Sequence, residues 1–299
     1  MNHSILESLS NFGIIPVVKI ENAGDALDLA EALRAAGLPC AEITFRTEAA
    51  EESIRSIARE FPEMLVGAGT VLTVDQAKRA ISAGAKFIVS PGLNEAVVRF
   101  CQEQNIAVMP GVSTATEIQR ALRLGISTLK FFPAEASGGL KTLKALAPVF
   151  GDVKFVPTGG LNSDNMMAYL QSGFVAAIGG SWMVKSNLIR AGRFDEITAL
   201  TREAVKKMLG FRLKKVILNE TNDAPKNLSP ALEANFLALF SFLELSAKGP
   251  SERLVIGTPF PERAAFFLEN SGLNVRSENG LIFVESPVKN REIILEKID

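Results

Sequence analysis

Short apolar runs alternate with amphipathic stretches from the beginning of the chain to about residue 210. One amphipathic stretch, residues 23–36, places four apolar residues on one helix face: Ala26, Leu29, Ala30 and Leu33. Another, residues 73–83, begins with Thr-Val-Asp-Gln, a pattern typical of a capped helix start. The apolar runs between such stretches have the length of buried strands. Strand followed by helix, repeated, predicts βα units around a parallel sheet.

The apolar runs predict eight strands before residue 210. They cover Ile15–Ile20, Cys40–Phe45, Leu65–Gly69, Phe87–Ser90, Ala107–Pro110, Thr128–Phe132, Lys154–Thr158 and Val175–Gly179. Eight such units in about 200 residues fit a (β/α)8 TIM barrel. The alternative is an open doubly wound sheet, but the first predicted strand is not followed by a G-x-G-x-x-G turn.

Composition restricts the partners and the compartment. The formal net charge is −1 and the basic residues form no runs, so neither nucleic acid nor a membrane surface is an expected partner. The first residues, MNHSILESLSNFG, lack the pattern of a leader peptide, and no stretch has the roughly 18 consecutive apolar residues of a membrane span. We therefore expect a soluble cytoplasmic protein that acts on a small molecule.

The histidine and cysteine counts restrict the chemistry. The only histidine is His3, which disfavours Ser-His-Asp, Cys-His and histidine-ligated zinc sites together. Cys40 and Cys101 have no metal-ligand or redox spacing, so we expect reduced thiols in the core or at the surface. Any catalysis must then use lysine, carboxylates, arginine, hydroxyls and backbone groups.

One lysine lies inside an apolar predicted strand. Alternation along the strand places Thr128, Lys130 and Phe132 on one face, and Leu129 and Phe131 on the other. If the second face packs against helices, Lys130 points into the fold. Removal from water favours the neutral amine, which can attack a carbonyl. The alternative is a lysine whose ammonium group reaches water at the strand end.

The carboxyl ends of the predicted strands carry polar and small residues. Glu42, Thr44 and Arg46 share one strand face, where a structural ion pair is the alternative to a catalytic carboxylate. Small residues end the other strands: Gly67–Thr70, Ser90–Gly92, Met109–Gly111, Pro157–Gly160 and Gly179–Ser181. The last two segments occupy loops where barrels commonly bind phosphate, although ordinary βα turns are the alternative.

Four motifs resemble the 2-keto-3-deoxy-6-phosphogluconate (KDPG) aldolase family, which includes 4-hydroxy-2-oxoglutarate (KHG) aldolases. They are Ala41–Thr47 (AEITFRT), Val66–Leu72 (VGAGTVL), Lys130–Glu135 (KFFPAE) and Pro157–Gly160 (PTGG). The resemblance covers roughly residues 5–209. It implies a homotrimeric (β/α)8 class I aldolase that acts on a small α-keto acid and needs neither a metal nor another cofactor.

The resemblance also implies roles for individual residues. Lys130 is similar to the Schiff-base lysine of the family, and Glu42 to its general acid/base. The implied substrate contacts are Arg46 and Thr70 for the pyruvate carboxylate, Pro91 and Phe132 as pocket walls, and Gly159, Gly160 and Ser181 around the phosphate. Thr158, next to these glycines, is a further expected substrate contact. Two other classes stay open at this point: a phosphosugar isomerase or epimerase, and a catalytically silent α-keto acid sensor.

Residues 211–299 lie outside that resemblance and predict a small α+β domain, with a boundary at Gly210. The predicted elements are strands at 213–219 and 254–257, helices at 230–245 and 261–271, a hairpin at 274–285 turning at Asn279-Gly280, and a final segment at 292–298. Residues 211–219 and 253–258 faintly resemble the glyoxalase/dioxygenase (vicinal oxygen chelate) superfamily. Because the segment has no histidine, we expect an appendage without metal that serves assembly or regulation. The alternatives are a passive extension and a second enzyme.

Overall fold

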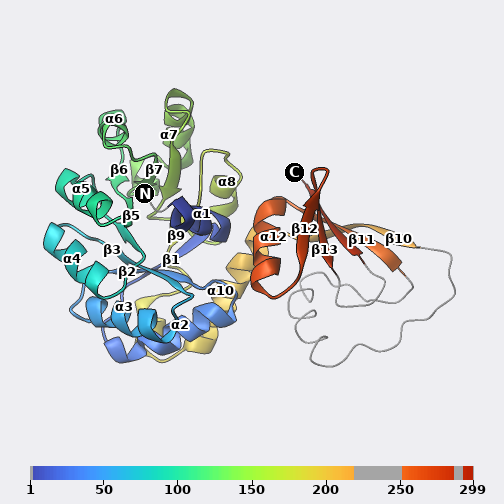
Figure 1. The fold of residues 1–299 in the computed structure, drawn as a ribbon, viewed down its shortest axis with the longest axis horizontal. Helices are drawn as coiled ribbons and strands as arrows, with labels where there is room; N and C mark the ends of the chain where they lie inside the picture. Colours follow the sequence, from blue (N-terminus) through green and yellow to red (C-terminus); the bar gives the residue numbers. More distant parts are fainter. Residues whose placement is uncertain (1–2, 219–250, 286–291, 299) are drawn as a thin grey trace. The chain divides into compact units, whose positions relative to one another are not determined.

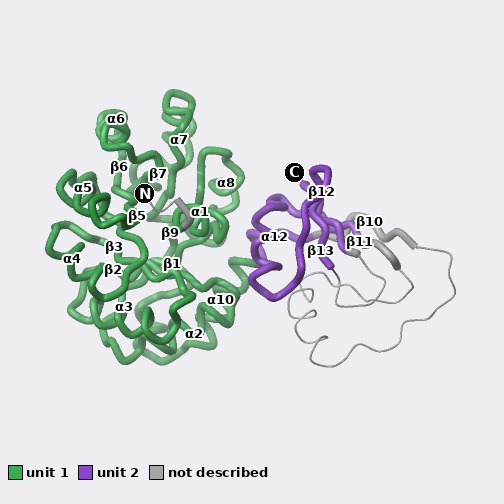
Figure 2. The backbone as a smooth tube through the Cα atoms, in the orientation of Figure 1, with its two compact units in different colours: residues 1–205 green, residues 206–299 purple. Residues whose placement is uncertain are grey.

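The computed structural model describes residues 3–218, 251–285 and 292–298 (Figure 1). The chain divides into two compact units, residues 1–205 and 206–299 (Figure 2). The division falls inside helix α10 (Phe194–Leu209), whereas the sequence places the domain boundary at Gly210, directly after that helix.

A curled parallel sheet forms the centre of the first unit. Six strands pair in the order β5-β4-β3-β2-β1-β9, and three more pair in the order β6-β7-β8. The strands are β1 (Ile14–Val18), β2 (Cys40–Thr44), β3 (Leu65–Gly69), β4 (Phe87–Val89), β5 (Ala107–Met109), β6 (Gly111–Val112), β7 (Thr128–Phe131), β8 (Lys154–Pro157) and β9 (Ile178–Gly180). The predicted α/β class with a parallel sheet is confirmed.

Two details differ from the predicted strands. The predicted fifth strand is divided at Pro110, which has no N–H for a ladder; its carbonyl instead accepts the Lys130 N–H at 3.0 Å. The predicted eighth strand, Val175–Gly179, is shorter in the structure, where β9 begins at Ile178. The residues around it pair with the β8 segment only through single bridges. These bridges join Phe155 to Val175 and Thr158 to Gly179, and they connect the three-stranded sheet to the β9 side of the larger one.

Most of the helices lie around the outside of this sheet, whereas α1 lies near its middle and contacts both β1 and β5 (Figure 1). They are α1 (His3–Phe12), α2 (Ala26–Ala35), α3 (Ala49–Glu60), α4 (Val74–Ser82), α5 (Glu95–Glu103), α6 (Ala115–Arg123), α7 (Gly139–Leu146), α8 (Met166–Leu170), α9 (Ser186–Arg190) and α10, with 3-10 turns at Ala23–Asp25 (η1), Glu135–Ser137 (η2) and Ala147–Val149 (η3). The predicted apolar face of α2 is buried throughout. The predicted cap of α4 is also confirmed, since the Thr73 hydroxyl accepts the Gln76 N–H at 3.1 Å.

The second unit contains a five-stranded sheet in the order β10-β11-β14-β13-β12, with α12 packed against β11, β13 and β14. Its elements are β10 (Arg212–Leu218), β11 (Ser251–Thr258), α12 (Pro261–Asn270), β12 (Val275–Glu278), β13 (Leu281–Glu285) and β14 (Glu292–Lys297). The predicted hairpin turn is present, with positive φ at Asn279 (52°) and Gly280 (76°), as a type I′ turn requires. The predicted helix at 230–245 lies outside the described residues.

Candidate active site

A lysine and a carboxylate form an ion pair in the interior of the first unit. Lys130 Nζ on β7 lies 3.2 Å from Oε1 of Glu42 on β2, and the two side chains are 5% and 4% exposed. Leu129 and Phe131 are fully buried on the opposite face of β7, as alternation predicts. The alternative of an ammonium group in open water is therefore wrong for Lys130.

Small residues make room for this pair. A Cβ atom on Gly69 would lie 2.1 Å from Oε1 of Glu42, so only glycine fits beside the carboxylate. The Phe132 ring lies beside the lysine, with its centroid 5.2 Å from Lys130 Nζ. An amine held in such a place can act as a nucleophile towards a ketone, and the neighbouring carboxylate can move protons.

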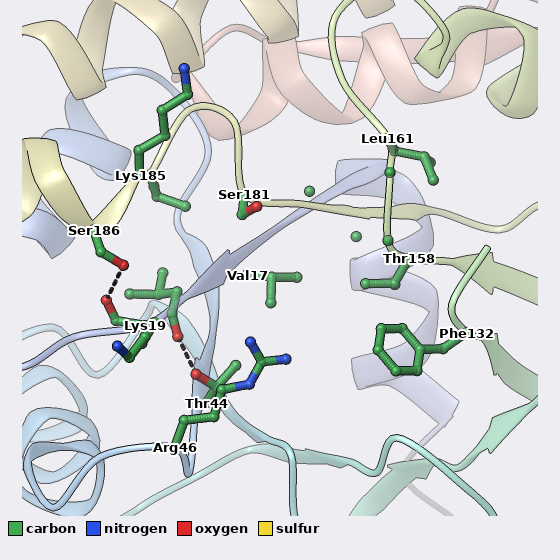
Figure 3. Close-up of a pocket in the computed structure, with 16 residues that line it drawn as sticks. Val17, Lys19, Thr44, Arg46, Phe132, Thr158, Leu161, Ser181, Lys185 and Ser186 are labelled. Carbon is green, nitrogen blue, oxygen red and sulfur yellow. Dashed lines mark hydrogen bonds between the residues drawn. The ribbon is translucent and has the colours of Figure 1, made fainter. Parts of the chain in front are cut away.

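A cavity of about 550 Å³ opens at the carboxyl ends of the strands (Figure 3). Six of the predicted site residues line it: Arg46, Phe132, Thr158, Gly159, Gly160 and Ser181. The Arg46 guanidinium projects into the cavity, towards the side of Phe132 (Figure 3). Phe132 connects this cavity to the ion pair, because the same ring lines the cavity and lies beside Lys130 Nζ.

The remaining predicted site residues are placed next to these. Thr70 Oγ1 accepts a hydrogen bond from Arg46 Nε at 3.3 Å, which ties the end of β3 to the arginine. Pro91 follows β4, and its carbonyl oxygen lies 2.2 Å from the point that a Cβ on Gly111 would occupy. Gly111 pairs with Lys130 in the sheet. Thr70 therefore lies beside Arg46, and Pro91 lies beside β6, the strand that pairs with β7; neither residue lines the cavity.

Sequence reasoning missed two basic residues on the cavity wall. Lys19 follows β1 and Lys185 precedes α9, and both line the cavity. Lys19 lies inside the predicted apolar strand Ile15–Ile20, as Lys130 lies inside its own strand, and this was a signal for the first; nothing in the local sequence marked the second. Lys19 Nζ pairs with Glu21 at 2.8 Å. The lining residues include three cations and no carboxylate, so the cavity favours anionic ligands.

The two thiols take no part in this site. Cys40 and Cys101 are both free and buried, so of the two predicted places, core and surface, they occupy the core. Burial raises the pKa of Cys101 to about 12 and raises that of Cys40 as well. Among the described residues there is no group of three or more His, Cys, Asp or Glu side chains that could hold a metal ion. In the same ranges no helix is long and apolar enough to cross a membrane.

Known proteins similar to this chain share its first unit. Residues 5–200 match the family described as KDPG and KHG aldolase. A 2-dehydro-3-deoxy-phosphogluconate aldolase from Treponema pallidum is 48% identical over 203 residues, which are 68% of this chain and 97% of that protein. A KHG/KDPG aldolase from Escherichia coli K12 is 44% identical over 67% of this chain and 94% of its own length.

Solved structures agree with these sequences. A KDPG aldolase from Legionella pneumophila, captured with pyruvate as a covalent carbinolamine, has a TM-score of 0.65 and 40% identity, over 67% of this chain and 97% of that one. A KDPG aldolase from Zymomonas mobilis ZM4 with 3-phosphoglycerate has a TM-score of 0.62 and 41% identity, over 67% and 94%. By its sequence and the fold of its first unit, the chain belongs to the KDPG and KHG aldolase family.

Proposed function

We propose that this aldolase works through an imine on Lys130, cleaving KDPG to pyruvate and glyceraldehyde 3-phosphate and KHG to pyruvate and glyoxylate. The observation that carries the proposal is the buried Lys130–Glu42 pair, 3.2 Å apart and beside a cavity lined with cations. The Legionella relative, in which pyruvate was captured as a carbinolamine, supports the same type of intermediate.

The chemistry follows from the charges of this pair. Lys130 first gives a proton to Glu42, and the neutral amine that results attacks the C2 ketone. Glu42 returns that proton to the carbinolamine hydroxyl, which leaves as water, and a protonated imine forms. The imine withdraws the electrons of the C3–C4 bond while Glu42 accepts the proton of the C4 hydroxyl, so that the aldehyde leaves. Glu42 then returns a proton to C3 of the enamine, and water hydrolyses the imine to release pyruvate. Every proton that Glu42 accepts is returned within one cycle.

The two ends of the substrate find separate partners in this proposal. Arg46 offers its planar fork to the α-keto acid carboxylate, and Thr70 supports it through the Nε–Oγ1 contact of 3.3 Å. Pro91 and Phe132 serve as apolar walls.

The phosphate group has its site in the loops after β8 and β9, with Thr158, Gly159, Gly160 and Ser181. In the described part of the chain, the N–H groups of Gly160 and Leu161 have no protein acceptor and are available to an anion. The Zymomonas relative with 3-phosphoglycerate supports a ligand that carries phosphate.

Further inferences concern the whole chain. We infer a closed (β/α)8 barrel in which β5 and β6 count as one strand interrupted by Pro110; the bridges Phe155–Val175 and Thr158–Gly179 support its closure. The homotrimer that the resemblance implies and the cytoplasmic location expected from the sequence stay predictions, as does an imine mechanism without metal or cofactor. For residues 211–299 we infer an appendage for assembly or regulation without chemistry of its own. A phosphosugar isomerase or a silent sensor is not favoured, because the chain belongs to an aldolase family and keeps Lys130 and Glu42.

Trapping the imine tests the proposal. Pyruvate with borohydride should attach a stable group to Lys130, identified by mass spectrometry of the peptide that contains it. Lys130→Arg should abolish both labelling and turnover, since a guanidinium is not a nucleophile here. Lys144→Arg, a change at an exposed position on α7, is the matched control and should label normally. Labelling of a different lysine, or none, would contradict the assignment.

A further inference from the structure

Glu135 ends the KFFPAE motif, yet it has no role in the reaction proposed above and does not line the cavity. It begins the 3-10 turn η2 after β7. Its carboxylate Oε1 accepts a hydrogen bond from the hydroxyl of Tyr169, which is on α8 and is the only tyrosine in the chain. Tyr169 is 2% exposed, so a buried phenol from one βα unit is joined to a carboxylate from the preceding one.

The backbone and stem of Glu135 also hold the glycine loop after β8. The Glu135 N–H donates to the Gly159 carbonyl at 3.1 Å, and the Ala134 N–H donates to the Thr158 carbonyl at 2.8 Å. A Cβ atom on Gly160 would lie 2.6 Å from the Cβ of Glu135. The glutamate stem thus lies directly against the loop that we assign to the phosphate.

The loop needs such support because of its own conformation. Gly159 and Gly160 have φ angles of 102° and 81°, and glycine has more conformational freedom to lose than any other residue. Fixed N–H groups bind an anion better than mobile ones, since less ordering is required on binding. Asn165 adds one restraint, with its Nδ2 donating to the Gly160 carbonyl at 3.1 Å.

We propose that Glu135 and Tyr169 are positioning residues, a Tyr169–Glu135 clamp that fixes the Gly159–Gly160 loop for the phosphate of the substrate. The inference rests on the proposed function. Little space is left around the Tyr169–Glu135 clamp, because a Cβ on Gly139 would lie 2.8 Å from the Tyr169 hydroxyl oxygen. Burial, and then the Glu135 carboxylate, raise the pKa of Tyr169, so the phenol keeps its proton and remains a donor at neutral pH.

Kinetics of three variants test the clamp. Tyr169→Phe and Glu135→Ala should each raise the KM for KDPG, and the inhibition constant of inorganic phosphate, by about 10-fold, the size of one lost hydrogen bond to a charged group. The kcat for KDPG and the KM for KHG should change by less than about 2-fold, because the imine site is not touched. Glu135→Gln keeps both the stem and an acceptor oxygen, so it should restore most of the phosphate selectivity.

Absorbance titration of the single tyrosine provides a second measurement. In Glu135→Ala the phenolate should appear at lower pH than in the unaltered protein, because the carboxylate no longer opposes ionisation. An unchanged titration would contradict the Tyr169–Glu135 contact.

The clamp and the proposed function fail in different experiments. Absence of imine trapping with pyruvate in the unaltered protein would contradict the proposed function. Normal trapping with an unchanged KM for KDPG in Tyr169→Phe and Glu135→Ala would overturn the clamp, as would equal losses for KDPG and KHG. Tyr169→Phe and Glu135→Ala each test the clamp independently. If Tyr169→Phe does not fold, the comparison of Glu135→Ala with Glu135→Gln decides whether the clamp supports phosphate binding.

Discussion

Lys130 Nζ and Glu42 Oε1 lie 3.2 Å apart although the two residues are 88 positions apart in the sequence. Each charge is almost completely removed from water, so each depends on the other for stabilisation. Removing either partner should therefore lower the free energy of unfolding as well as the activity. Variants that keep the shape of the side chain are the informative ones.

Glu42→Gln keeps that shape and removes the proton acceptor. We expect turnover to fall by roughly 100-fold or more, the usual size of a lost acid/base step, while imine trapping survives in part. Steady-state kinetics and borohydride labelling measure the two effects. Glu60→Gln, an exposed position at the end of α3, is the control. Unchanged turnover would reduce Glu42 to a structural partner of Lys130.

Gly69→Ala should disturb the carboxylate without removing any functional group. The new Cβ would lie 2.1 Å from Oε1 and 2.5 Å from Cγ of Glu42, so the side chain must move away from Lys130. We expect a loss of kcat of at least about 10-fold together with lower thermal stability, as overpacking usually costs about 1–3 kcal/mol. Gly151→Ala, where nothing lies within 4 Å, should alter neither. Normal activity in Gly69→Ala would mean that Glu42 can work from another position.

Ser181→Ala should separate the two substrates. Ser181 lines the cavity in the loop after β9, which we assign to the phosphate, so its loss should raise the KM for KDPG and leave that for KHG nearly unchanged. Ser82→Ala at the exposed end of α4 controls for the substitution itself. Equal effects on both substrates would place the phosphate elsewhere.

The buried thiols predict a pH dependence of stability. Burial raises the pKa of Cys101 to about 12, so the folded protein holds a proton that the unfolded chain releases above about 8.5. The buried Cys101 thiol therefore makes its full contribution to the free energy of unfolding below about pH 8.5. That contribution is lost as the pH rises towards 12.

Thermal unfolding between neutral and alkaline pH should therefore show a decline that is shallower in Cys101→Ala. The native thiols should also resist thiol reagents until denaturant is added. Fast labelling of the native protein would show that the cysteines are accessible.

Truncation after Gly210 tests the division of labour along the chain. The shortened protein retains all of α10 and every residue that we place in the active site. We expect it to keep imine trapping and turnover, with any change confined to solubility or oligomeric state, measured by size-exclusion chromatography with light scattering. A folded but inactive truncated protein would assign the second unit a part in catalysis.

Local sequence predicted the parts of the site that depend on strand alternation. That rule placed Lys130 and Glu42 in the interior, and the Asn279-Gly280 pair marked a hairpin turn that is present. The distance between Lys130 and Glu42 depends on how the sheet curls, which no local pattern encodes. Tyr169 was missed for a related reason, because its partner Glu135 belongs to a different βα unit.

Thr70 has a φ angle of 56°, in the left-handed region that β-branched residues rarely adopt. Such a conformation typically costs about 1–3 kcal/mol, and here its hydroxyl meets the arginine that we assign to the substrate carboxylate. Asparagine or glycine would relieve the backbone strain at this position, but neither carries the hydroxyl that contacts Arg46. Selection for heat resistance alone should then replace Thr70, whereas selection for growth on the substrate should keep it. At this position, a gain in thermal tolerance is therefore expected to reduce catalytic fitness.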